Sequence, residues 1–309
     1  MRRPRGAGFR RLLAAMAVPF CLVSARNCPA AEGAGFNGGH AFDDLKRLVA
    51  FGPRPSGSQA LAQSRQWIVG QLRQMGAQVE EDAFVASTPL GSLPMANLIA
   101  KFPGARSQVV IVAGHYDTKR FEDIRFLGAN DGGSSAACLL ELSRWLVHRK
   151  NALTYWLVFF DGEEAVRKWS ATDSLYGSRH LVQKLSASGE LSRVQALILV
   201  DMIGDAQLDI LREYKSTPWL AKLVFNVARR LGYAKYFSAR ELAIDDDHIP
   251  FVNAGVSAVD LIDYDYGPQN SYWHTADDTP AHCSPLSLTI VGRVVTGTLG
   301  ELEKSLRLP

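Results

Sequence analysis

Apolar residues gather in short, dense runs that alternate with longer stretches of helical spacing. Four runs contain almost no polar residue, and this pattern predicts strands that are covered on both faces. They span residues 108–113, 154–160, 196–200 and 256–262. Two more mixed runs, residues 78–85 and 96–102, predict edge strands.

Helical periodicity fills most of the intervals between these runs. It spans residues 43–51, 58–75, 134–149, 174–185, 217–231 and 286–306. Strands that alternate with helices predict the α/β class, here as a single-domain α/β sandwich around a mostly parallel, twisted central sheet flanked by helices. In such folds the functional sites form at the carboxyl ends of the strands.

The first 25 residues have a different character from the rest. Five arginines precede an apolar run at residues 12–23, and the small residues Ser24 and Ala25 follow it. This layout predicts a secretory signal peptide over residues 1–25, a flexible mature N-terminus over residues 26–39 and a catalytic domain over residues 40–309. We therefore expect export to the periplasm or the medium. An uncleaved amphipathic anchor is the alternative.

Removal of residues 1–25 changes the charge of the chain. The whole sequence has a formal net charge of +3, and the segment contains five arginines and no acid, so the mature chain has 3 − 5 = −2. We therefore expect no nucleic-acid partner and no stable membrane insertion. The cysteines form no CxxC pair; Cys138 is expected to be buried, and a Cys28–Cys283 disulfide stays open.

Acidic and histidine residues follow the predicted strands. The carboxyl ends of parallel strands lie at the same edge of a sheet, so these residues are expected to be close together. Each one alone would ordinarily be a helix cap, a turn or a surface residue. Their coincidence at one rim is what indicates a site. The residues are His115, Asp117, Glu163, Glu164, Asp201 and His274, together with Asp131 at the head of a predicted helix.

Such a cluster of anions would repel itself, and a divalent cation is the natural compensator. Carboxylates with imidazole and without thiolate suit zinc, which in catalytic sites takes three protein ligands and one open position. Asp131, Glu164 and His274 supply that set. Neighbours on an extended segment point in different directions, so Glu163 is free to act as the acid/base.

Longer motifs surround these residues: Phe160-Asp161-Gly162-Glu163-Glu164-Ala165 with Trp169, the run at 173–181, the run at 246–251 that begins Asp246-Asp247-His248, and Trp273-His274-Thr275-Ala276-Asp277-Asp278. From about Phe42 to the C-terminus the chain resembles the zinc aminopeptidase superfamily. Within that superfamily it is most similar to the glutaminyl-peptide cyclotransferases.

The resemblance implies a zinc aminopeptidase-like fold, one zinc ion per chain, and cyclisation of N-terminal glutaminyl residues of peptides or proteins to pyroglutamyl with release of ammonia. It implies a proton-sharing pair of Asp201 and Asp246 beside Glu163, and a substrate pocket formed by Trp169, Trp273, Tyr266 and Ile244. His115 and Asp117 would support the metal or hold a second one. Animal members carry a histidine where this chain has Asp260. We expect a monomer.

Two alternatives stay open at this point. In a two-zinc aminopeptidase, His115, Asp131 and Asp201 would bind a second ion and Glu163 would activate a water molecule. A metal-free binding module on the same scaffold would have no need of an intact base and ligand set.

Overall fold

The structure is a computed structural model that describes residues 35–305 of the 309. The predicted signal peptide and Cys28, one half of the disulfide considered above, lie outside the described residues. Cys283 is buried. Between Gly35 and Ser305, no helix is both long enough and apolar enough to cross a membrane.

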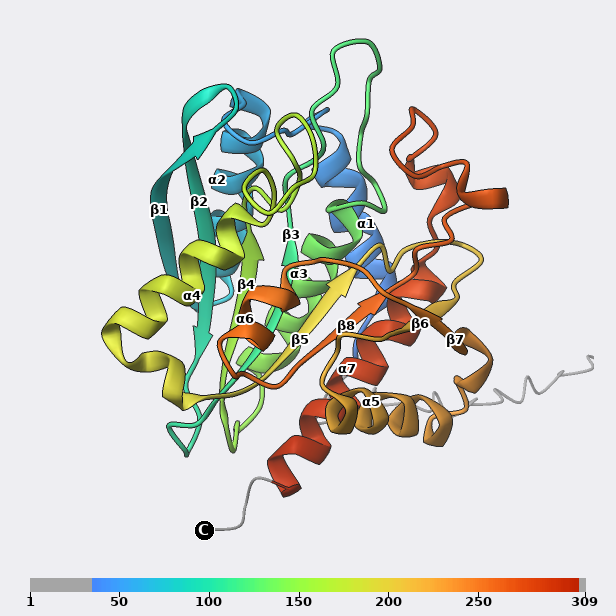
Figure 1. Cartoon of the computed structure of the whole chain (residues 1–309). Coiled ribbons are helices and arrows are strands. Elements are labelled where there is room, and N and C mark those ends of the chain that lie inside the picture. The colour runs from blue at the N-terminus through green and yellow to red at the C-terminus, as the bar shows by residue number, and fades with distance from the viewer. Residues whose placement is uncertain (1–34, 306–309) are drawn as a thin grey trace, which may run out of the picture. The chain divides into compact units, whose positions relative to one another are not determined.

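A six-stranded sheet forms the centre of the fold (Figure 1). Its four strands β3, β4, β5 and β8 run parallel, and β1 and β2 add an antiparallel hairpin at one side. In spatial order the strands are β1 (Gln78–Thr88), β2 (Gly91–Phe102), β4 (Thr154–Phe160), β3 (Val109–His115), β5 (Val194–Asp201) and β8 (Ala258–Ile262). The predicted fold class is confirmed.

Helices cover both faces of the sheet, because the central strands are apolar on both sides. In β3, Val110 and Val112 point into the larger hydrophobic core, whereas Ile111 and Ala113 point into the smaller one. The helices α4 (Tyr176–Ser188) and α6 (His248–Asn253) pack on the smaller core. The larger core is covered by α1 (Gly38–Val49), α2 (Gln59–Gln74), α3 (Gly133–Val147), α5 (Pro218–Arg230) and α7 (Pro285–Ser305).

The remaining elements are short. The strands β6 (Ile210–Glu213) and β7 (Phe237–Leu242) form a small parallel sheet, and β6 packs beside β8. The part of the chain that the structure describes also contains four single-turn 3₁₀ helices: η1 (Glu190–Arg193), η2 (Ala234–Tyr236), η3 (Pro268–Asn270) and η4 (Pro280–His282).

Two sequence-based expectations about the fold were wrong in detail. The strand β2 is not an edge strand, because it pairs with β1 on one side and β4 on the other, and its residues from Met95 to Ala100 are all buried. Helix α1 begins at Gly38, five residues earlier than expected. The Asn37 side chain caps it by accepting from the Gly39 and His40 amides, and a Cβ on Gly38 would lie 2.1 Å from the Pro285 carbonyl.

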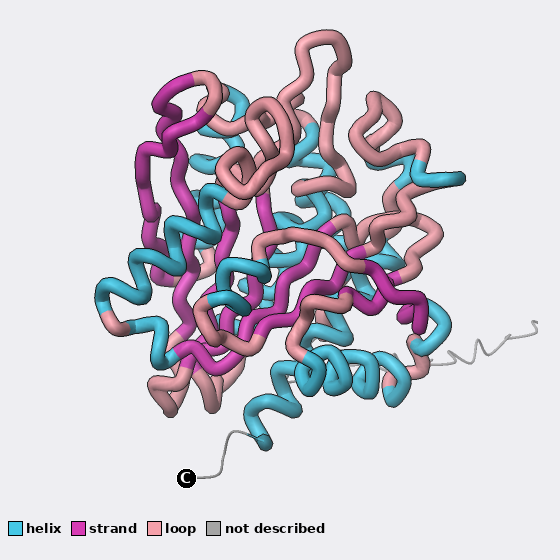
Figure 2. Tube along the Cα trace, viewed as in Figure 1, coloured by secondary structure: helices cyan, strands magenta, loops and turns pink. Residues whose placement is uncertain are grey.

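The loops that follow β3, β4, β5 and β8 gather at one end of the sheet (Figure 2). They are residues 116–132, 161–175, 202–209 and 263–279. This is the carboxyl edge of the parallel strands, where α/β folds place their sites. The topology therefore brings together polar residues that lie far apart in the sequence.

Candidate metal centre and active-site pocket

Three of the predicted ligands, which we call the ligand trio, come together at this edge. They are Asp131, Glu164 and His274, and they belong to three different loops. His274 Nε2 lies 3.2 Å from Asp131 Oδ2 and 3.0 Å from Glu164 Oε1. Zinc bonds of 2.0–2.2 Å in a tetrahedron separate neighbouring ligand atoms by about 3.3 Å. The trio therefore fits a zinc ion in donor type and in spacing.

Contacts within the ligand trio and with its neighbours favour an ionised Asp131 and a protonated His274 when no metal is bound. Burial alone would lower the pKa of His274, but its contacts with Asp131 and Glu164 outweigh burial and raise the pKa to about 9. Burial would raise the pKa of Asp131, yet hydrogen bonds from His115 and His274 hold it below its ordinary value. The second oxygen of Glu164, Oε2, lies 3.1 Å from the Lys119 ammonium.

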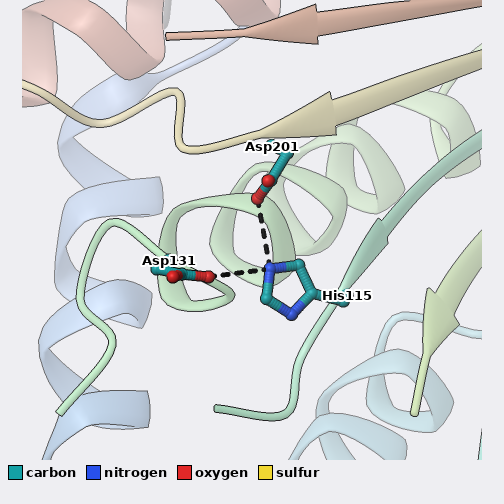
Figure 3. Close-up of side chains that lie close together, drawn as sticks. All are labelled: His115, Asp131 and Asp201. Carbon is teal, nitrogen blue, oxygen red and sulfur yellow. Dashed lines mark hydrogen bonds and ion pairs between the residues drawn. The ribbon is translucent and has the colours of Figure 1, made fainter. Parts of the chain in front are cut away.

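A second group of candidate ligands shares Asp131 with the trio (Figure 3). His115 Nε2 lies 3.2 Å from Asp131 Oδ1 and 3.1 Å from Asp201 Oδ1. The other ring nitrogen of His115, Nδ1, faces Asp117 Oδ1 at 3.4 Å. Asp117 Oδ1 also accepts a hydrogen bond from the Glu163 amide, so Asp117 links His115 to the backbone of Glu163.

Two buried charges hold the loop that carries Asp131. The Asp278 carboxylate accepts from the Asn130 amide at 2.7 Å and from the Asp131 amide at 3.1 Å. From the other side, the fully buried Arg54 guanidinium donates to the carbonyls of Leu127 at 2.9 Å and Gly128 at 3.0 Å. The loop is thus fixed by its backbone, which leaves the Asp131 side chain to face the pocket.

Glycine is required immediately after Asp131. Gly132 has a φ of 82°, and a Cβ there would lie 2.3 Å from the Asp117 carbonyl. The chain needs this conformation to turn from the Asp131 loop into helix α3. His274 also adopts a left-handed conformation, with φ of 55°, which is a strained position for a residue with a side chain.

Glu163 lies beside a group of buried acids, and we call Glu163, Asp246, Asp247 and Asp260 the acid cluster. Burial raises the pKa of every member above its ordinary value, and the neighbouring carboxylates raise it further. For Asp246 the pKa rises to about 7. Within the described chain, no lysine or arginine pairs with any of the four.

Asp246 has Asp201 and Asp260 among its acidic neighbours, and the sequence predicted the first of them. Among the described residues no hydrogen bond joins Asp201 to Asp246; Asp201 Oδ1 instead contacts His115. Burial raises the pKa of Asp260, and the nearby Asp246 carboxylate raises it further. Asp201 is nonetheless a neighbour of Asp246, because among the nearby charges it raises the pKa of Asp246 most, and Asp260 of the buried strand β8 is a second acidic neighbour.

A buried histidine and a buried glutamate lie next to Asp260, and His248 Nδ1 is 3.8 Å from Asp260 Oδ2. His248 Nε2 lies 3.1 Å from Glu213 Oε2, and both side chains are fully buried. The Asp260 amide donates to Ser216 Oγ, and this hydroxyl donates to the same Glu213 oxygen. These bonds tie the short sheet β6–β7 to the acid cluster.

The ligand trio and Glu163 line one pocket of about 480 Å³. Three of the four predicted substrate-binding residues, Trp169, Trp273 and Ile244, also line it. The Trp273 ring stacks on His274 with 4.1 Å between ring centroids. Of the second ligand group, Asp131 and Asp201 line the pocket as well, whereas His115 does not line it and is 1 % exposed; Asp117 is buried to the same degree.

Tyr266 was wrongly predicted as a substrate-binding residue. Its side chain is fully buried, does not line the pocket, and donates from its hydroxyl to Asp278 Oδ1 at 3.1 Å. Tyr266 therefore helps to position the Asp278 carboxylate, which holds the Asp131 loop. Tyr264, two residues earlier, lines the pocket in its place and packs against Trp273.

Sequence reasoning missed four residues of this site: Lys119, Arg54, Asp278 and Asp260 in its present role. Only Asp260 gave a readable signal, as a charged residue inside an otherwise apolar strand. The sequence motif around His274 included Asp278, but nothing indicated that its carboxylate would bind backbone amides 147 and 148 residues away.

Comparison with known proteins places the chain among enzymes of one family. Residues 97–299 match Peptidase family M28. The glutaminyl-peptide cyclotransferase-like protein of Bos taurus is 32% identical over 277 residues, which cover 80% of this chain and 72% of that protein.

Solved structures give the same picture. A glutaminyl cyclase from an Acidobacteriales bacterium matches with a TM-score of 0.86 and 40% identity, covering 91% of this chain and all of that chain. A Zn-dependent exopeptidase from Parabacteroides distasonis matches with a TM-score of 0.78 and 26% identity, covering 86% and 98% of the two chains.

Proposed function

This chain belongs to the glutaminyl-peptide cyclotransferases of peptidase family M28, and we propose that Asp131, Glu164 and His274 hold one zinc ion beside the base Glu163. It is an enzyme that cyclises N-terminal glutaminyl residues to pyroglutamyl and releases ammonia. One observation carries the assignment of the site: the three candidate ligands, Glu163 and two tryptophans line a single pocket.

A zinc ion in the ligand trio would supply Lewis acidity toward the side-chain amide of the glutaminyl residue. The trio faces the pocket, and this leaves room for the open coordination position that a catalytic zinc needs. In the group of His115, Asp131 and Asp201, the one histidine is fully buried and does not line the pocket, and Asp131 already belongs to the trio, which favours one ion over two.

Glu163 moves the proton that the reaction must transfer. The α-amine of the substrate attacks the side-chain amide carbon, a C–N bond forms, and the bond from that carbon to the amide nitrogen breaks. Glu163 accepts the proton from the attacking amine and returns it to the nitrogen that leaves as ammonia, so no proton is gained or lost. The Asp117 carboxylate fixes the Glu163 backbone for this task.

The rest of the acid cluster helps to raise the pKa of Glu163, so that this residue can hold the transferred proton. Asp246 and Asp260 share a proton, since two close, buried carboxylates resist double ionisation. Asp201 contacts His115 and adds to the repulsion that raises the pKa of Asp246. We assign Asp201 and Asp246 supporting catalytic roles through Glu163.

The pocket walls bind the glutaminyl side chain and exclude water. Trp273 is fixed by stacking on His274 and by contact with Tyr264. Ile244 and Trp169 line the same space. An apolar wall that keeps water from the amide carbon favours cyclisation over hydrolysis.

The experiment that tests the function incubates the purified, zinc-loaded protein with a glutaminyl peptide. Ammonia should be released, and mass spectrometry should find the peptide shortened by one ammonia with every peptide bond intact. A two-zinc aminopeptidase would instead release free N-terminal amino acid, and the metal content would be two ions per chain. The second ligand group is the observation that makes this alternative worth testing.

We also propose that residues 1–25 direct export, that residues 40–309 form the catalytic domain, and that the mature enzyme is a monomer. Expression of the full chain in a bacterium, followed by N-terminal sequencing of the exported protein, tests the cleavage. Light scattering of the same sample measures the oligomeric state.

A further inference from the structure

A second hollow adjoins the active-site pocket on the far side of Trp169. It encloses about 350 Å³ between the loop that follows β4 and helix α6. Trp169 and Asp245 line both spaces, so the hollow opens directly beside the pocket. Its other lining residues are Ser170, Ala171, Ser174, Leu175, Arg179, Ile249, Pro250 and Asn253.

The wall between the two spaces is held firmly in place. The Asp173 carboxylate accepts from the backbone amides of Val166, Arg167 and Lys168, at 2.8–2.9 Å, and from the Tyr176 hydroxyl. These bonds fix the segment that carries Trp169. The backbone next to Trp169 is therefore ordered by the folded loop.

The charged groups of the hollow are already engaged. Three nitrogens of the Arg179 guanidinium donate to the carbonyls of Leu175, Ala171 and Ser174. Asp245 pairs with Lys215 at 2.5 Å. The side chains left to receive a ligand are mainly the apolar ones of Leu175, Ile249 and Pro250. The hollow consequently favours an apolar group over an anion.

We propose that this hollow, the extension pocket, binds an apolar side chain at the third position of the substrate peptide. This inference rests on the proposed function, because the N-terminal glutaminyl residue must occupy the first pocket. In an extended peptide the first and third side chains point to the same side, and two residues span about 7 Å. A peptide that leaves the first pocket past Trp169 thus presents its third side chain to the extension pocket.

The test compares peptides of equal length that carry Leu, Glu or Gly at the third position after an N-terminal Gln. For the wild-type enzyme, kcat/KM should be about tenfold higher with Leu than with Gly, the scale of partial burial of one leucine side chain. Glu should give no such gain. Equal kcat/KM for the Leu and Gly peptides would overturn the extension pocket.

Two variants and a matched control sharpen the result. Asn253→Trp fills the hollow from the exposed end of α6, and it should reduce the Leu-to-Gly ratio of kcat/KM to about one. Ile249→Ser should reduce the same ratio by removing an apolar contact. Ala254→Trp adds the same side chain at the neighbouring exposed position, which does not line the hollow, and should keep the wild-type ratio.

The possible failures are distinguishable. If Asn253→Trp and Ile249→Ser both keep the wild-type ratio, the third side chain binds elsewhere and the proposal is wrong. If none of the peptides releases ammonia, the proposed function itself fails. Zinc content and circular dichroism of each variant identify a variant that has not folded, in which case the other variant decides.

Discussion

Two sets of acidic side chains lie at the same edge of the sheet and differ in the charges that surround them. In the ligand trio, Asp131 and Glu164 contact cationic partners, namely His274 and Lys119. In the acid cluster, Glu163, Asp246, Asp247 and Asp260 are equally buried, yet their pKa values are raised and no lysine or arginine of the described chain pairs with them.

The difference teaches how one chemical group serves two purposes. A buried carboxylate that has cationic partners stays ionised, and the same position suits a metal ion. A buried carboxylate that faces mainly other carboxylates lowers its energy by keeping a proton. The trio is thus prepared for a cation and the acid cluster for proton transfer, although the two sets differ little in residue type.

The largest expected effects come from substitutions at two adjacent residues, one from each set. Glu163→Gln should lower kcat by about a hundredfold or more, because the amide cannot carry the proton, and should keep the zinc. Glu164→Gln should instead lose the zinc. Ammonia release and metal analysis measure the two outcomes. Glu122→Gln, at an exposed loop position, is the control and should match the wild type. Retention of both metal and turnover in both site variants would contradict our assignment.

A smaller effect is expected when the support of the trio is removed. In Asp278→Asn, one carboxylate oxygen becomes an amide NH₂ that faces a backbone N–H, so the Asp131 loop loses one of its two anchors. We expect zinc affinity to fall about 10- to 100-fold, the usual effect of a residue that orients a ligand. Competition with a coloured chelator measures it. Asp277→Asn, the exposed neighbour, should bind zinc like the wild type.

The smallest expected effect concerns the acid cluster and pH. The pKa of Asp246 is about 7 in the folded chain and has its ordinary, lower value in the unfolded chain. The folded state therefore holds the proton more tightly. The stability contributed by Asp246 is fully present below about pH 4 and is lost as the pH rises through 7.

Asp246→Asn removes this titration, so its free energy of unfolding should fall less between pH 4 and pH 7 than that of the wild type. We expect the difference to be at least about 1 kcal/mol. Urea unfolding of the metal-free proteins at several pH values measures it. Asp245→Asn, at the exposed neighbour, should reproduce the wild-type slope. An unchanged slope in Asp246→Asn would mean that Asp246 is ionised throughout this range.

The sequence predicted the sheet well because its central strands are apolar on both faces. The strand β4 was predicted with its observed bounds, and the ends of β3 and β5 were close to the observed ones. The position of β2 within the sheet was not predictable, since pairing with β4 depends on contacts between distant segments. The start of α1 was missed because Gly38 and Gly39 read as loop, whereas close packing on α7 is what requires a glycine.

The candidate ligands and Glu163 were predictable because strand ends place them in register. The partners of these residues were not. Tyr266 and Asp278 are close in sequence to His274, but their shared hydrogen bond is made in the interior. Asp246 has acidic neighbours on both β5 and β8, and no local pattern indicates that Asp260 of β8 would be one of them.

Arg54 has a consequence for how the enzyme must assemble. Burial lowers the pKa of its guanidinium to about 10, so the group is still charged when it binds the Leu127 and Gly128 carbonyls. It lies outside residues 97–299, the part that matches the family. A fragment limited to those residues would hold every candidate ligand and still lack one anchor of the Asp131 loop. During synthesis the N-terminal segment emerges first. Arg54 can form its bonds to the Asp131 loop only after that loop, about seventy residues later in the chain, has been made.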